Sequence, residues 1–436
     1  MTIIIGGGWA GLAAAIELSH HRIPVSLIES AGQLGGRART IHYRGIDIDN
    51  GQHLILGAYH ETLRILTIVG VSETDIFERL PLKLRLFQPG YRDTVLSLPA
   101  LPAPLHVMLG LTLAKGISLQ DRWHGIQMCA SLAAMDNNKN DDMSVLELLT
   151  RKKQSNRMIT TLWQPLCLAI LNTPVEIASS KIFIKSLRDA FVYKHRDSDL
   201  LIARSNLGAI LPEPAHRYIE HQGGIVRLQQ RVKRLVIDHG KITGVELSKG
   251  EFMSANNVIL AVPPTNCSEL LMPYTAMHDI TGMLAEMEYA PICTLYLQYP
   301  ATTRLPLPMV GLIGSLGQWI FDRRHYGQAG LMAVVISSHG PHMDMDNDAL
   351  CIKVIDEVAR AFPEWPEPVE SFVIRERRAT FLCRTGINSI RPSTRTPVEG
   401  CLLAGDYTAT YYPATLEGAV RSGINAARHV IKTNRQ

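Results

Sequence analysis

The sequence lacks the cysteine patterns that mark metal sites and disulfide-stapled folds. Its 436 residues include seven cysteines, and no two of them have the Cys-x-x-Cys spacing of a zinc or redox motif. An odd number of widely separated cysteines gives no disulfide framework, so we expect no bound metal and a reducing, cytosolic compartment. The first residues carry neither a basic segment nor a small-residue cleavage site, and the sequence therefore predicts no signal peptide.

An excess of one charge and a long apolar run are also missing. Lys and Arg number 44 against 40 Asp and Glu, a formal net charge of +4, and no dense basic stripe accompanies it, which argues against nucleic acid as a partner. No run reaches the ~18 uninterrupted apolar residues of a membrane-spanning helix. The nearest run, residues 96–119, is interrupted by prolines and by His106. Such a segment can lie on a membrane surface without crossing it.

The composition is that of a folded, globular protein. Apolar residues make up 46% of the chain and charged residues 19%, a balance that excludes a largely disordered chain. A single hydrophobic core stops growing at roughly 250–300 residues. We therefore expect at least two units, each with its own core.

A nucleotide-binding pattern opens the chain. Residues 2–5 are typical of a short buried strand, residues 9–19 of a helix and residues 24–28 of a second strand. Glu29 follows the second strand at the position where an acidic side chain accepts the hydroxyl groups of an adenosine ribose. An acidic residue there argues against a 2′-phosphate, and hence against NADP.

The turn between the first strand and the helix contains Gly-x-Gly-x-x-Gly. Gly6 permits the tight turn, Gly8 lets the backbone approach a pyrophosphate, and Gly11 allows close packing of helix against strand. The first helical residues, Trp9 and Ala10, offer free N–H groups and the positive end of the helix dipole to the anion. The alternative is an ordinary glycine turn, which the ordered series of strand, glycines, helix, strand and acid disfavours.

A second glycine-rich loop distinguishes FAD from NAD as the cofactor. Gly35, Gly36 and Arg37 come soon after the second strand and combine a backbone that can pass close to a ligand with a guanidinium for phosphate. NAD-dependent folds seldom need a second phosphate loop at this point. The alternative interpretation of this segment alone is a basic surface turn.

With these motifs, the sequence resembles the FAD-dependent amine oxidase and phytoene desaturase superfamily. The resemblance continues near the C-terminus, in Leu-Ala-Gly-Asp-Tyr-Thr around Gly405 and Asp406 and in residues 413–423. It implies that Asp406 holds the ribityl chain, that a helix beginning near Thr415 and Leu416 directs its N-terminus at the flavin ring, and that the backbone at Val232 meets the adenine. Without the resemblance, Gly-Asp is equally typical of a strand-end turn that caps a helix.

Three segments are similar to the hydroxysqualene dehydroxylase family: residues 49–59, which contain Gly51 and Gln52 as cofactor contacts, residues 162–174 and residues 413–423. The resemblance implies reductive removal of an allylic hydroxyl in squalene and hopanoid biosynthesis. Hydride passes from N5 of reduced FAD to the allylic carbon, and water is lost. The sequence departs from the family pattern at Tyr407, where tryptophan is expected, and at Tyr411 and Tyr412, where Gly-Leu is expected.

The resemblance implies an α/β fold. A Rossmann-like FAD-binding domain, with a parallel sheet and a β-meander, is predicted from residues 1–85, 205–265 and 385–436, and an interleaved α+β substrate-binding domain from residues 86–204 and 266–384. Alternating strands over 232–237 and 242–247, followed by an apolar strand over 257–262, predict the meander and its return to the sheet. Residues 136–142 are expected to form a polar loop.

Two catalytic candidates follow from the chemistry that the family implies. A departing hydroxide needs a proton donor, and His53 and Asp49 lie in the segment that approaches the flavin in relatives. His53 is favoured because histidine can be protonated near neutral pH. The alternative is that His53 merely hydrogen-bonds the backbone or the cofactor. Tyr411 and Tyr412 are weaker candidates, as proton donors or as aromatic faces for a carbocation.

The expected partners are a long-chain isoprenoid substrate, a membrane surface and the upstream enzyme that forms hydroxysqualene. Apolar residues among the prolines of residues 98–119 favour a helix that rests on the bilayer, with an ordinary core helix as the alternative. The predicted location is the cytoplasm, including the inner face of the membrane. Alternative functions are an isoprenoid desaturase, which transfers hydride to FAD, and a non-catalytic prenyl-binding protein. An amine oxidase is disfavoured because Thr415 occupies a position that is commonly aromatic in those enzymes.

Overall fold

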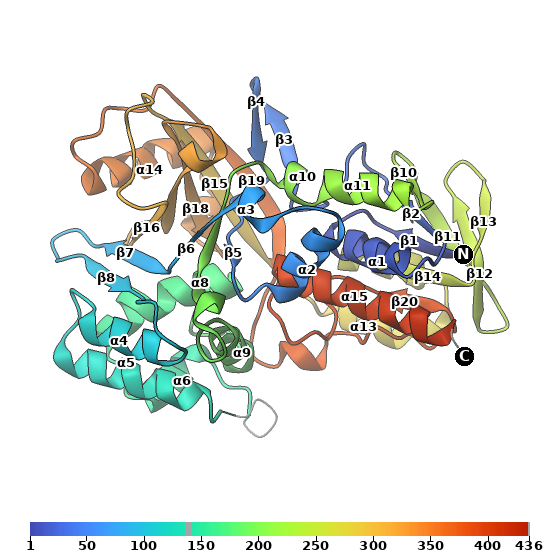
Figure 1. Cartoon of the computed structure of the whole chain (residues 1–436), viewed down its shortest axis with the longest axis horizontal. Coiled ribbons are helices and arrows are strands. Elements are labelled where there is room, and N and C mark those ends of the chain that lie inside the picture. Colours follow the sequence, from blue (N-terminus) through green and yellow to red (C-terminus); the bar gives the residue numbers. More distant parts are fainter. Residues whose placement is uncertain (136–140, 435–436) are drawn as a thin grey trace.

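A computed structural model describes residues 1–135 and 141–434. A five-stranded parallel sheet lies toward one end of the molecule, at the right in Figure 1. The strands follow the order β10 (Ile225–Arg227), β2 (Val25–Ile28), β1 (Thr2–Ile5), β14 (Asn257–Leu260), β20 (Cys401–Leu403). Neighbouring strands all pair in parallel, and the inner ones are buried on both faces, as their continuous apolar sequences predict.

The two faces of this sheet bury different layers. One face, which includes Ile4 and Leu27, packs against α1 (Trp9–His20), α11 (Pro212–His221) and α15 (Leu416–Thr433). Residues one position along, such as Ile3 and Ile5, join a core shared with the meander, because side chains alternate across a strand. The meander consists of antiparallel β11 (Val232–Asp238), β12 (Lys241–Leu247) and β13 (Phe252–Ser254).

Two glycines let the first and last helices approach each other and the sheet. A Cβ atom at Gly423 of α15 would lie 2.0 Å from the carbonyl oxygen of Ala10, and one at Gly11 of α1 would lie 1.9 Å from the carbonyl oxygen of Gly6. No side chain fits at either position. The N-terminus of α1 is therefore held against both the first glycine turn and the C-terminal helix.

A second, mixed sheet contains seven strands. Its order is β19 (Glu370–Phe381), β15 (Tyr289–Gln298), β18 (Leu331–Ser337), β17 (Trp319–Asp322), β16 (Met309–Leu312), β7 (Lys83–Phe87), β8 (Thr94–Ser97). All neighbours are antiparallel except β16 and β7. Helix α14 (Asn347–Ala361) shares a core with this sheet. The predicted α/β architecture, with a parallel FAD-type sheet and a mixed second sheet, is confirmed; strand β7 straddles the predicted boundary at residue 85, and the domain boundaries stay predictions.

Helices gather on the side of the second sheet where β7 and β8 lie (Figure 1). They are α4 (Leu105–Leu113), α5 (Leu119–Leu132), α6 (Val145–Arg151), α8 (Gln164–Leu171) and α9 (Ser180–Phe191), with a π-helical turn over Ile159–Trp163 before α8. Most of the polar loop predicted at 136–142 lies outside the described residues. Among the helices of the described chain, none is both long and apolar enough to cross a membrane.

Short elements complete the fold. Three strands, β5 (Ile55–Leu56), β9 (Leu200–Ala203) and β6 (Phe77–Leu80), form a small sheet, and β3 (Thr40–Tyr43) pairs with β4 (Ile46–Asp49). The remaining α-helices are α2 (His60–Ile68), α3 (Glu73–Ile76), α7 (Asn156–Met158), α10 (Leu207–Ile210), α12 (Pro264–Leu271) and α13 (His278–Ala285).

Candidate active site

A cavity of about 1250 Å³, which we call the large cavity, lies at the carboxyl ends of the central strands. This is the edge at which parallel sheets bind their ligands. Most of the predicted cofactor residues line it: Gly6, Gly8, Trp9, Ala10, Glu29, Gly35, Gly36, Arg37, Val232, Gly405, Asp406, Thr415 and Leu416. Gly11 does not line the cavity and acts through packing. Gly51 and Gln52 line a neighbouring cavity instead.

Two glycine loops face each other across the wall of the large cavity. Helix α1 begins after Gly8 without a side-chain cap and without an acidic residue in its first turn. Gly8 forms an isolated β-bridge with Gly35, and Gly35 and Gly36 both have positive φ angles, +108° and +61°. The loops therefore present backbone rather than side chains, next to helix N–H groups that lack a capping side chain. Such a surface suits a phosphate group.

The carboxylate of Glu29 is fixed at the end of β2. Its Oε2 accepts a hydrogen bond of 2.7 Å from the backbone N–H of Gly7, and its Oε1 accepts one of 2.7 Å from Ala31 N. A carboxylate has about four acceptor sites, two on each oxygen. Oε1 also accepts from Ser30 Oγ at 3.2 Å, so the free acceptor site is on Oε2. Glu29 is thus held in a position to accept the hydroxyl groups of a ribose.

Asp406 links segments that are far apart in the sequence. Nη2 of Arg37 donates to its Oδ1 at 2.6 Å, and Nη2 of Arg391 donates to its backbone carbonyl at 2.8 Å. Burial opposes the charge on Arg37, but the Asp406 carboxylate outweighs it and raises the pKa of Arg37. Burial lowers the pKa of Arg391 to about 10. The sequence analysis did not single out Arg391, which contacts the 406–412 loop mostly through backbone carbonyls.

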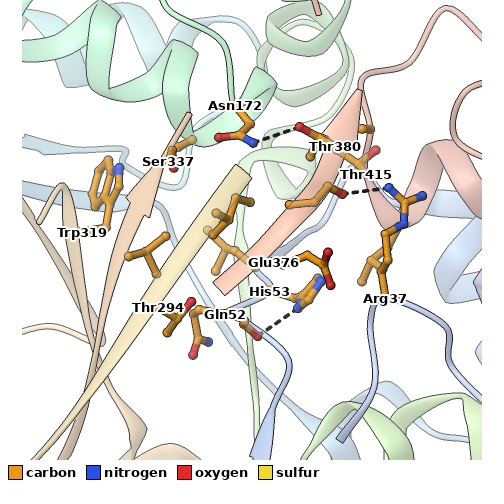
Figure 2. Close-up of a pocket in the computed structure, with 18 of the residues that line it drawn as sticks. Arg37, Gln52, His53, Asn172, Thr294, Trp319, Ser337, Glu376, Thr380 and Thr415 are labelled. Carbon is orange, nitrogen blue, oxygen red and sulfur yellow. Dashed lines mark hydrogen bonds between the residues drawn. The ribbon is translucent and has the colours of Figure 1, made fainter. Parts of the chain in front are cut away.

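A smaller cavity of about 210 Å³ adjoins the large cavity, and the two share Arg37, His53 and Thr415 (Figure 2). Its apolar wall comes from α8, the seven-stranded sheet and the loop before β5, and it contains Leu54, Leu168, Ala169, Ile170, Ile292, Met309, Trp319, Phe321, Val335 and Ile374. Its polar lining includes Asn50, Gln52, Asn172, Thr294, Ser337, Glu376 and Thr380. We call it the small cavity.

The two catalytic candidates have different surroundings. Nδ1 of His53 lies 3.1 Å from the carbonyl oxygen of Gly51, and burial lowers the pKa of His53 despite the opposing effect of Asp49. Asp49 lines neither cavity. It is buried, accepts a 2.8 Å hydrogen bond from Leu207 N and lies 3.5 Å from Nη1 of Arg323. Burial raises the pKa of Asp49, and the cationic Arg323 opposes that rise.

Tyr411 and Tyr412 lie outside both cavities. The Tyr411 side chain is exposed, whereas the Tyr412 hydroxyl donates to Asp189 at 2.6 Å and accepts from Lys185 at 3.0 Å. Tyr407, the other departure from the family pattern, lines the large cavity and is buried. Tyr412 therefore joins the 406–415 loop to α9, and neither Tyr411 nor Tyr412 lines a cavity.

Several residues of the small cavity were missed by the sequence analysis. Glu376 lies on β19, and its Oε2 accepts a hydrogen bond of 3.3 Å from the Asn50 side chain. Asn172 is fully engaged: its Nδ2 contacts Thr380 Oγ1 at 2.9 Å, and its Oδ1 accepts from Ser338 N at 2.6 Å. Residues 162–174 were recognised as a family signature, but nothing in their pattern reveals these distant partners.

Residues 9–431 match the family model described as flavin containing amine oxidoreductase, and the chain belongs to this family. Membership implies FAD as the cofactor. Among its relatives are hydroxysqualene dehydroxylases from Rhodopseudomonas palustris (26% identical, covering 99% of this chain and 98% of that protein) and Sinorhizobium fredii (28%, 97% and 96%). Zeta-carotene desaturase from Arabidopsis thaliana is 23% identical over 98% of this chain and 84% of its own length.

Solved structures share the fold at low sequence identity. An oxidoreductase from Methanosarcina mazei superposes with a TM-score of 0.77 at 14% identity, covering 98% of this chain and 99% of its own. Putrescine oxidase bound to putrescine gives 0.72 at 16% identity, covering 99% and 98%. These likenesses concern the architecture. The chain is thus a flavin-dependent oxidoreductase, and the large cavity, with its side-chain-free loops and fixed carboxylate, fits the nucleotide that the family uses.

We predict that Glu29→Ala weakens FAD binding. Loss of acceptors for ribose hydroxyls removes charged hydrogen bonds of about 1.5–3 kcal/mol, roughly a 10- to 100-fold rise in Kd. Fluorescence titration of the apoprotein with FAD measures this change. Glu29→Gln, which keeps one acceptor oxygen, should have an intermediate effect, and Glu220→Ala on the surface of α11 serves as the control. An unchanged Kd in Glu29→Ala contradicts the role.

Proposed function

We propose that this protein reduces hydroxysqualene to squalene. In the reaction the allylic C–O bond breaks, a hydride adds to that carbon, and the departing oxygen takes up a proton to leave as water. The observation that carries the proposal is the match to hydroxysqualene dehydroxylases along nearly the full length of both chains. The apolar wall of the small cavity, next to the flavin-type site, supports an isoprenoid as the substrate.

Reduced FAD supplies the hydride when it is bound. The chain itself supplies three things: an apolar wall that excludes water from a carbocation, a loop that positions the substrate, and a proton. We propose His53 as the proton donor. Its Nδ1 faces the Gly51 carbonyl, so Nε2 is the atom that is left to hold and deliver the proton. Asp49, paired with Arg323, positions the loop that carries His53.

The similarity to zeta-carotene desaturases supports a second candidate, an isoprenoid desaturase. A desaturase needs the same cofactor and an apolar cavity, but hydride moves from the lipid to FAD. The lower identity of those relatives, 22–23%, makes this the weaker candidate. A non-catalytic prenyl-binding protein would purify without flavin absorbance.

We predict that hydroxysqualene reoxidises the photoreduced enzyme anaerobically, with one squalene formed per flavin. Stopped-flow absorbance and lipid analysis measure the two quantities. Phytoene and squalene serve as matched hydrocarbon ligands and should leave the reduced flavin unchanged. The proposal fails if hydroxysqualene does not reoxidise the flavin, and it is replaced by the desaturase if phytoene reduces the oxidised enzyme.

We predict a pH-dependent rate that depends on His53. Burial holds the pKa of His53 below its ordinary value of about 6.5. The proton is therefore present below that lowered pKa and is lost as the pH rises through it, so single-turnover rates should increase toward acidic pH. His53→Ala should lower the rate by about 10²–10⁴-fold and flatten the profile. His42→Ala, which alters an exposed histidine, is the control; wild-type rates in His53→Ala exclude the role.

We also propose that α4 places the enzyme on a membrane surface. Leu105, Leu109 and Leu113 recur every fourth residue and are 54%, 37% and 64% exposed, whereas the opposite face of α4 is buried. The neighbouring α5 adds Leu119 and Trp123, which are 79% and 59% exposed. A row of exposed leucines is unusual for a helix that faces water. An apolar helix face beside tryptophan suits the boundary between headgroups and acyl chains.

The membrane contact predicts that the double variant Leu109→Asp/Leu113→Asp loses binding to vesicles. Removing two apolar contacts and adding charge should weaken co-sedimentation with phosphatidylcholine vesicles by at least about 10-fold, given ~1.5–3 kcal/mol for each buried leucine. Both side chains are partly exposed, so the thermal midpoint should change little. The matched control is Ile352→Asp/Val369→Asp, which alters two exposed residues away from α4, one on α14 and one just before β19. Equal sedimentation of all three proteins contradicts the proposal.

A further inference from the structure

One buried donor in the small cavity has no partner in the described protein. Trp319 begins β17, and its side chain is 3% exposed and lines the small cavity. Within residues 1–135 and 141–434, no acceptor lies within hydrogen-bond distance of its Nε1. A buried N–H without an acceptor costs about 1–3 kcal/mol, and nearly all such groups in folded proteins are paired. An acceptor supplied from the cavity would remove this cost.

The other buried tryptophans show the usual arrangement. Nε1 of Trp9 donates to the carbonyl of Ala38 at 3.0 Å, and Nε1 of Trp163 donates to Oε1 of Gln154 at 2.8 Å. Neither of these residues lines the small cavity. The indole that lacks an acceptor is therefore the one that faces the proposed substrate space.

The indole of Trp319 is held by its strand neighbours. It pairs with Gly311 of β16 and with Val335 of β18. A Cβ atom at Gly311 would lie 3.3 Å from the ring, so this glycine gives the indole its space. Two neighbouring polar groups already have partners. The backbone N–H of Ser337 donates to Gln318 Oε1, and the Asn172 side-chain amide donates to the carbonyl of Pro291 and to Thr380 Oγ1.

Trp319 and Arg37 lie on opposite sides of the small cavity (Figure 2). Arg37 belongs to the side that the small cavity shares with the large cavity, whereas Trp319 belongs to the substrate-side sheet. A carbon that receives hydride faces the flavin side. An oxygen on that carbon can then point toward the sheet, where Trp319 offers a donor that has no partner.

We propose that Nε1 of Trp319 donates a hydrogen bond to the hydroxyl oxygen of the substrate, and that this bond selects an isoprenoid alcohol over the corresponding hydrocarbon. The inference rests on the proposed function and sharpens it. A desaturase substrate is a hydrocarbon and has no oxygen that could accept a hydrogen bond from Nε1, whereas the hydroxyl oxygen of an alcohol can accept one. Trp319 is in this view a specificity-determining residue that acts in binding, and proton delivery remains with His53.

The test compares binding of hydroxysqualene and squalene to the oxidised holoenzyme, in which the alcohol is not turned over. Perturbation of the flavin absorbance gives both dissociation constants. Trp319→Phe should weaken hydroxysqualene binding about 3- to 10-fold, as expected for one lost hydrogen bond, and should leave squalene binding within about twofold. Trp319→His, which keeps a ring N–H, should recover part of the preference and provides a second variant if Trp319→Phe folds poorly.

Trp163→Phe is the matched control, because it removes a buried indole outside the cavities. Flavin content and thermal midpoint establish that each variant is folded. An unchanged ratio of the two dissociation constants in Trp319→Phe and Trp319→His overturns the inference, and a water molecule is then the partner of Nε1. If the wild type neither prefers the alcohol nor is reoxidised by it, the proposed function itself fails. Reoxidation by the alcohol with an unchanged ratio refutes the Trp319 role alone.

Discussion

The site depends on how closely backbone segments from opposite ends of the chain approach one another. Helices α1 and α15 meet where Gly423 faces the carbonyl of Ala10, and α1 meets the first strand where Gly11 faces Gly6. Side chains at either glycine would push the helices apart. The close contact brings the uncapped start of α1 to the same cavity as Asp406, and the Arg37–Asp406 ion pair is part of the lining of that cavity. The shape of the predicted cofactor site follows from this packing.

A second constraint on the site comes from a buried cation, the guanidinium of Arg323. Arg323 is fully buried, with Gln52 Oε1 at 3.1 Å, Gln328 Oε1 at 2.6 Å and Asp49 Oδ2 at 3.5 Å, and the ring of Tyr326 lies 4.1 Å from its guanidinium carbon. Removing one partner of such a network leaves a buried charge uncompensated, which is costly. The turn that follows β17 thereby fixes the loop from Asp49 to His53.

The part of the site that depends on neighbouring residues in the chain could be predicted from the sequence. Gly8, Gly36 and Glu29 have roles that follow from backbone space and from their place beside a strand end, and the structure brings them to one cavity. The alternating strands of the β-meander were likewise a local pattern, and they predicted β11 and β12. The fold class followed from the family resemblance, and it is confirmed.

Other features depend on pairing between distant segments, which residue type does not encode. Trp319 and Glu376 reach the small cavity only because β17 and β19 have a particular register with β18 and β15. Asp49 was proposed as an acid because its segment approaches the flavin in relatives, but its side chain lies 3.5 Å from Arg323 and lines neither cavity. The pairing of β7 with β16 likewise joins residues more than two hundred positions apart.

The order of strands in the five-stranded parallel sheet has a consequence for the assembly of the protein. Strands β1 and β2 are made first, but their neighbours β10, β14 and β20 come from residues 225–227, 257–260 and 401–403. Pairings over such sequence distances form slowly, because the entropy of closing a long loop is lost before any stabilising contact forms. During synthesis the edges of the first strands are therefore exposed for most of the translation time. Such edges are prone to aggregation, and this places a demand on chaperones that a fold with consecutive domains would avoid.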